Sequence, residues 1–180
     1  VGSEMFIRDS GITVDPNGKF WYLTLAHGNP YGKIIKYSTK DNTAIDQTTL
    51  GLFPASMQIS KITGFIYCVN FNLHGDMKPS SVSVIDAETM TEITKIKTGS
   101  MPHGSRISKD GLKQYSVAMM SGELFEIDAL SLNVSRKLDL ENHSLMDHSK
   151  MDMSNNKMKH SSVKPTWVIP HPNKPLAYVT

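Results

Sequence analysis

The chain has 180 residues, a length that suggests one domain with a sizeable core. Its net charge of +2 gives no strong electrostatic footprint for nucleic acid or an anionic membrane, and no apolar run is long enough to span a bilayer. The single cysteine, Cys68, excludes an internal disulfide and any multi-cysteine zinc or iron–sulfur site, and we expect it to be a small buried thiol.

A strand–turn–strand unit recurs along the chain. Its four copies are "ITVDPNGKFWYLT" (12–24), "MQISKITGFIYCV" (57–69), "SRISKDGLKQYSV" (105–117) and "VIPHPNKPLAYVT" (168–180). In each copy a short alternating strand leads through a tight turn to a second strand that contains a tyrosine: Tyr22, Tyr67, Tyr115 or Tyr178. The separations between successive tyrosines are 45, 48 and 63 residues, and the last is lengthened by an insert. The underlying period is roughly 45 residues, which is typical of propeller blades.

The second half of the repeat also reads strand, polar turn, strand, at 32–45, 80–96 and 122–138. Four antiparallel strands per repeat make one blade of a β-propeller. Asp86 and Asp128 stand just before the turns, where an aspartate commonly accepts hydrogen bonds from backbone N–H groups two residues on. We therefore predict an all-β chain in which 1–180 is a single partial β-propeller of about three and a half blades.

The segments "SVSVIDAETMTEITKIKTGSMPHGSRISKDG" and "AYVT" resemble the YVTN-type β-propellers. The resemblance covers nearly the whole chain and is specific to the fold. It implies a seven-bladed ring and an extracytoplasmic protein, periplasmic or secreted. The remaining blades would come from a longer chain or from a second copy, and Val1 looks like the start of a processed or excerpted chain.

Six of the seven histidines are expected on one face of the propeller. Antiparallel pairing puts the connections between the second and third strands of a blade on the same face as the links between blades. His27 and His74 follow second strands, His103 precedes a first strand, and His143, His148 and His160 lie in a link between blades. His171 falls in a turn on the opposite face.

The insert between the third and fourth blades, 141–163, is rich in methionine and histidine and has neither a helical nor a strand period. Imidazole and thioether together suit copper, while zinc remains an alternative for an all-histidine site. The candidate metal ligands are His27, His74, His103, His143, His148, His160, Met146, Met151 and Met153. The alternative without a metal site is that the histidines belong to exposed turns and that the insert is an inert loop.

Two functions follow from these residues. In the first, the chain is similar to the propeller domain of nitrous oxide reductase, where histidines from several blades converge on copper, so it would belong to a copper-dependent oxidoreductase. A small-molecule substrate or an electron-transfer partner would then meet this face, although no catalytic residue can be named. In the second, the propeller is a non-catalytic scaffold or surface binding module whose Met/His loop scavenges metal or is inert.

Overall fold

The computed structural model describes residues 11–141, 144–146 and 161–180, and within these ranges it is built of strands and turns with no helix. Three sheets of at least four strands are followed by one of two strands, all antiparallel and all in chain order. Blade 1 contains β1 (Ile12–Val14), β2 (Phe20–Leu25), β3 (Lys33–Ser38) and β4 (Ala44–Thr49). Blade 2 contains β5 (Pro54–Ile59), β6 (Phe65–Asn70), β7 (Pro79–Asp86) and β8 (Thr91–Ser100). Blade 3 contains β9 (Pro102–Ile107), β10 (Lys113–Ala118), β11 (Glu123–Asp128) and β12 (Asn133–Asp139), and blade 4 contains β14 (Val168–Pro170) and β15 (Ala177–Val179).

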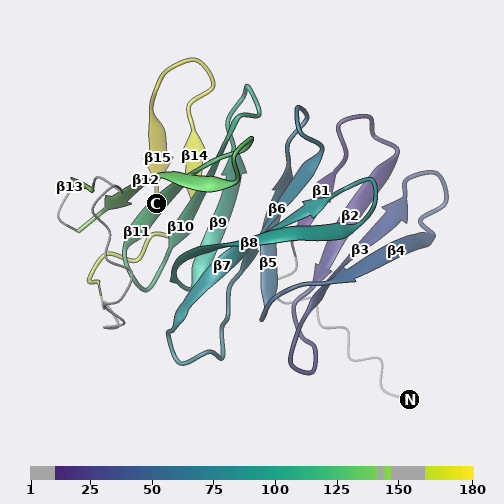
Figure 1. Ribbon diagram of the computed structural model, residues 1–180, viewed down its shortest axis with the longest axis horizontal. Helices are drawn as coiled ribbons and strands as arrows, with labels where there is room; N and C mark the ends of the chain where they lie inside the picture. The colour runs from purple at the N-terminus through teal and green to yellow at the C-terminus, as the bar shows by residue number, and fades with distance from the viewer. Residues whose placement is uncertain (1–10, 142–143, 147–160) are drawn as a thin grey trace.

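The blades stand side by side in the order of the chain (Figure 1). Their first strands are neighbours in space: β1 lies beside β5, β5 beside β9, and β9 beside β14. The predicted all-β fold, a partial propeller of about three and a half blades, is confirmed. The part of the chain that the structure describes contains no helix long and apolar enough to cross a membrane.

One strand was not expected from the repeat. β13 (Ser144–Met146) lies inside the Met/His-rich insert and pairs antiparallel with β12, so that blade 3 gains a fifth, outermost strand. Residues 142–143 and 147–160 of the insert lie outside the described residues.

The outer hairpins of blades 2 and 3 have the turn chemistry that the sequence predicts. The Asp86 carboxylate accepts hydrogen bonds from the backbone N–H groups of Glu88 and Thr89, at 2.8 and 3.2 Å. The Asp128 carboxylate accepts from those of Leu130 and Ser131, at 3.1 and 2.9 Å. Both aspartates therefore stabilise turns, and neither needs a catalytic explanation.

The core lies between blades, because neighbouring sheets bury the faces that they turn toward one another. One cluster joins blades 1 and 2 and includes Tyr22, Ile34, Ile66 and Cys68. A second joins blades 2 and 3 and includes Tyr67. Cys68 is a fully buried free thiol, as expected, and burial raises its pKa well above the usual range.

The repeated tyrosine carries a hydrogen bond from one blade to the next. The Tyr22 hydroxyl donates to the carbonyl oxygen of Ala87 at 3.3 Å, and the Tyr67 hydroxyl donates to that of Ala129 at 3.2 Å. Both carbonyls belong to the outer hairpin turn of the following blade. Burial raises the pKa of both phenols to about 12, so they remain donors at any physiological pH.

We expect Tyr67→Phe to destabilise the protein more than Tyr22→Phe. The Ala87 carbonyl still accepts from Lys36 Nζ at 2.7 Å when Tyr22 loses its hydroxyl, so the cost should be about 0.5–1.5 kcal/mol. Among the described residues, the Tyr67 hydroxyl is the donor to the Ala129 carbonyl oxygen. Leaving that buried carbonyl without a donor should lower the free energy of unfolding by about 1–3 kcal/mol. Urea unfolding measures both values. Tyr31→Phe, at a side chain that is 55% exposed, is the matched control, and equal losses in all three variants would contradict the prediction.

Candidate metal-binding site

Two of the predicted ligands, His27 and His74, meet on one face of the propeller. His27 follows β2 in blade 1, and His74 follows β6 in blade 2, so both lie in connections between second and third strands. Both are exposed, and their ring centres are 6.1 Å apart with 36° between the ring planes. Their meeting follows from the topology, because the same connection in adjacent blades leads to the same end of the sheets.

The distance between these rings suits a shared metal ion. A metal bound to an imidazole nitrogen at about 2.0–2.1 Å lies roughly 3 Å from the ring centre, so two rings that share it have centres about 5–6.5 Å apart. The observed 6.1 Å falls in that range. Imidazole is a good ligand for both copper and zinc, so the donor chemistry fits the ions that the sequence suggests.

A row of aromatic rings extends the pair across blades 2 to 4. Phe53 contacts His27 edge-on at 4.8 Å between ring centres and lies 5.9 Å from Phe71. Phe71 contacts His103 at 5.3 Å, and His103 contacts Trp167 at 5.1 Å, both edge-on. Sequence reasoning missed Phe53, Phe71 and Trp167, because an aromatic residue at a strand end reads as core. The signal available was that Phe53 and Phe71 adjoin the loops that carry the histidines.

His103 lies apart from the other two, at the second position of β9 rather than before it. Its Nδ1 is 2.9 Å from the carbonyl oxygen of Thr166. A carbonyl only accepts, so Nδ1 carries the proton, and Nε2 is the nitrogen that the neutral form of the ring would offer to a metal. This is the tautomer that an Nε2 metal ligand requires, and a backbone carbonyl is a common partner for the other nitrogen of such a ligand.

His103 and Trp167 also border a cavity of about 300 Å³ that is lined by residues at the first strands, among them Ile12, Ala55 and Arg106. The guanidinium of Arg106 stacks over the Trp167 ring, 4.9 Å from its centre. Since first strands surround the axis of a propeller, this cavity belongs to the central channel. The aromatic row therefore leads from the histidine pair to the channel wall.

Four methionines belong to, or pack against, the core cluster that joins blades 2 and 3. Met101 is buried in the cluster that contains Phe53 and Phe71, and the half-buried Met77, Met119 and Met120 pack against the same cluster. Phe53, Met77 and Met101 have φ angles of 54°, 57° and 53°, in the left-handed region that such side chains rarely adopt. Strain of this kind costs about 1–3 kcal/mol per residue, but Met90 and Leu132 have φ angles of 53° and 57° in outer hairpin turns, so it is not confined to this face.

The two ends of the Met/His insert meet near this face. The Ser162 hydroxyl donates to the Glu141 carboxylate at 2.6 Å, and the Ser161 N–H donates to the Met120 carbonyl at 3.3 Å. Met120 belongs to the connection between β10 and β11, the blade 3 counterpart of the loops that hold His27 and His74. The predicted ligands His143, His148, His160, Met151 and Met153 lie outside the described residues, and Met146 is the last residue of β13.

His171 has a structural explanation on the opposite face. It stands in the turn between β14 and β15, and its Nδ1 accepts hydrogen bonds from the backbone N–H groups of Asn173 and Lys174, at 3.0 and 3.1 Å. Residues 11–141, 144–146 and 161–180 bring no three His, Cys, Asp or Glu side chains together in a group that could hold a metal ion. The described part of the site is therefore a pair of histidines whose rings both contact Phe53.

Comparison with known proteins supports the fold. No protein-family model matches the sequence, and no curated protein does. Among solved structures, the hydrazine synthase of Kuenenia stuttgartiensis is similar with a TM-score of 0.66 and 20% identity over 88% of this chain. A functionally unknown protein from Desulfotomaculum acetoxidans is similar with a TM-score of 0.66 and 13% identity over 95% of this chain. The chain spans 37% and 48% of the length of these two proteins. Blades and comparisons together define the class of fold as propeller-like.

Proposed function

We propose that this chain is the metal-binding part of an extracytoplasmic, YVTN-type β-propeller that holds copper through loop histidines on one face. The observation that carries the proposal is the His27–His74 pair, with ring centres 6.1 Å apart on adjacent blades. Thioethers from the Met/His insert, whose ends meet near the same face, would complete the ligand set. Soft sulfur ligands favour Cu(I) over hard cations.

The propeller would act within a copper-dependent oxidoreductase. Bound copper would supply electron transfer and Lewis acidity at this face. The chain's own residues would set the conditions: Phe53 would pack against both rings of the pair, and the Thr166 carbonyl would hold His103 through Nδ1. One similar structure bears the name of an enzyme, hydrazine synthase, although at 20% identity the likeness concerns the fold alone.

One observation favours the alternative, a non-catalytic scaffold or surface module. The described residues gather two histidines rather than three or more ligands, and two ligands hold a metal less firmly than a closed four-coordinate site. In this alternative the pair would bind metal weakly and reversibly, as a scavenger does.

Elemental analysis of the protein purified without chelator distinguishes these functions, together with titration by Cu(I), Cu(II) and Zn(II). We expect about one copper per chain, and a nitrogen hyperfine pattern from two imidazoles in the Cu(II) spectrum. If zinc is found instead of copper, the proposed site stands and the identity of the metal is corrected. Binding of neither ion above that of a His27→Ala/His74→Ala variant would contradict the proposal, and recovery of the native protein from the cytosol would contradict the location.

A further inference from the structure

The cavity of about 300 Å³ on the central channel has walls from three consecutive blades and from the segment that enters the fourth. Most of its lining stands at or near the beginnings of first strands, which start from the links between blades. These links share a face with the loops that hold the histidine pair, so the cavity lies at the mouth of the channel on that face. Its lining includes Ile12, Ala55, Met57, His103, Arg106 and Trp167.

Arg106 supplies the positive charge of this cavity. Side chains alternate along a strand, and Ser105 faces blade 2, since its hydroxyl donates to the Tyr67 carbonyl oxygen at 3.1 Å. Arg106 therefore faces blade 4, where its guanidinium stacks over the Trp167 ring, 4.9 Å from the ring centre. One of its N–H groups donates to the Ser105 carbonyl oxygen at 2.8 Å. The stacking and this hydrogen bond together hold the guanidinium at the cavity wall.

The Trp167 ring is itself held in place. His103 contacts it edge-on, with 5.1 Å between the ring centres. The main chain at Trp167 also lies close against β9, because a Cβ atom at Gly104 would stand only 3.1 Å from the Trp167 Cα. The aromatic ring and the guanidinium on it are therefore positioned before any ligand arrives, and a preformed site loses less free energy to ordering when it binds.

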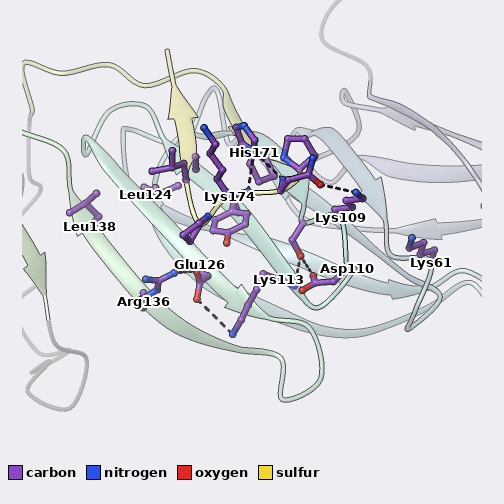
Figure 2. Close-up of a pocket in the computed structure, with 18 residues that line it drawn as sticks. Lys61, Lys109, Asp110, Lys113, Leu124, Glu126, Arg136, Leu138, His171 and Lys174 are labelled. Carbon is purple, nitrogen blue, oxygen red and sulfur yellow. Dashed lines mark hydrogen bonds and ion pairs between the residues drawn. The ribbon is translucent and has the colours of Figure 1, made fainter.

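The charge of Arg106 is not neutralised within residues 11–141, 144–146 and 161–180, where no ion pair links it to a carboxylate. The other arginine in these ranges differs. Figure 2 shows the guanidinium of Arg136 against the Glu126 carboxylate, which also lies 3.7 Å from Lys113 Nζ. Arg106 is half-buried and keeps most of its N–H donors for a ligand. A guanidinium in this state suits a carboxylate, which accepts two parallel hydrogen bonds from it.

We propose that this cavity binds a small organic carboxylate, whose anionic group pairs with Arg106 and whose apolar part lies against Trp167, Ile12 and Met57. A volume of about 300 Å³ is at the lower end for small-molecule sites, so the ligand is compact. The Ile12 side chain is 63% exposed and offers apolar surface for such a ligand to cover. Arg106 and Trp167 are not metal ligands, so this site is independent of the proposed copper site.

Benzoate is the probe, and isothermal titration calorimetry of the whole chain after treatment with a chelator measures its binding. We expect one saturable site per chain. Benzamide, which has the same ring without the charge, should bind about tenfold more weakly or worse. Sulfate, an anion without an apolar part, should also bind more weakly than benzoate. The chelator removes metal that would itself bind a carboxylate, and the His27→Ala/His74→Ala variant should bind benzoate as the original chain does, so failure of one site is distinguishable from failure of the other.

Arg106→Gln should weaken benzoate binding by about 10- to 100-fold, the usual effect of losing a hydrogen bond to a charged group. Arg106→Lys keeps the charge without the planar fork and should fall between the two. Arg136→Gln is the matched control and should leave binding unchanged, because Glu126 already pairs with that guanidinium. Melting temperatures show that each variant is folded.

Four results would overturn the proposal. They are the absence of saturable binding at millimolar benzoate, equal binding of benzoate and benzamide, equal losses in Arg106→Gln and Arg136→Gln, and sulfate binding as tight as that of benzoate. The last would mean that the cavity holds anions in general and that its apolar wall plays no part in recognition.

Discussion

Replacing His74 or His27 by alanine should weaken copper binding by more than about 100-fold. The two imidazoles lie 6.1 Å apart between ring centres and are the proposed ligand pair. Loss of even an outer-shell partner of a metal ligand costs about 10–100-fold in affinity, so loss of a ligand should cost more. Competition with a chromophoric Cu(I) chelator measures the change. The affinity for copper should also decrease as the pH is lowered, because protons then compete with the metal for the imidazole nitrogens.

The matched control is His171→Ala, which removes a histidine from the opposite face, where it serves a turn. His103→Ala distinguishes a site made by His27 and His74 from one that also uses His103 as a ligand. The rings of Phe53 and Phe71 stand between His103 and the pair, so we expect a smaller loss than in the His74 variant. Full binding by the His27→Ala/His74→Ala double variant would show that the pair is not a site.

The blades could be predicted because their signals are local and repeated. An alternating strand, a turn and a tyrosine recur about every 45 residues, and the same residues perform the same task in the structure: Tyr22 and Tyr67 both bond to the next blade. The turns after Asp86 and Asp128 could be predicted for the same reason, because each aspartate bonds to backbone N–H groups only two and three residues further along the chain. Signals of this kind survive in a single sequence, because they depend on chain neighbours.

The site could be predicted only in part, because its geometry depends on contacts between distant residues. Topology indicates that His27 and His74 share a face, but their ring distance depends on Phe53, which contacts both rings. β13 is another example: its three residues have no strand pattern, and they form a strand because β12 offers a free edge. Lys36 reads as an exposed lysine, yet it is buried with its ammonium group on the Ala87 carbonyl of the next blade.

Tyr67→Ala should destabilise the protein by about 3–5 kcal/mol, the usual cost of deleting a large aromatic side chain from a core. Tyr67 is fully buried between blades 2 and 3, and its ring packs in the cluster with Val84 and Ile127. The substitution removes that packing together with the hydrogen bond to Ala129. A loss of this size is a large part of the total stability of a domain, so we expect much of the variant to be unfolded at 37 °C.

Urea unfolding followed by tryptophan fluorescence measures the change, with Tyr178→Ala as the matched control. Tyr178 has the same position in blade 4, but its side chain is 57% exposed in the described structure, so its loss should cost less than about 1 kcal/mol. Comparison with Tyr67→Phe separates the hydroxyl from the ring. If Tyr67→Ala and Tyr178→Ala cost the same, packing between blades 2 and 3 does not hold the propeller together. A larger cost for Tyr67→Ala would mean that this packing stabilises the propeller.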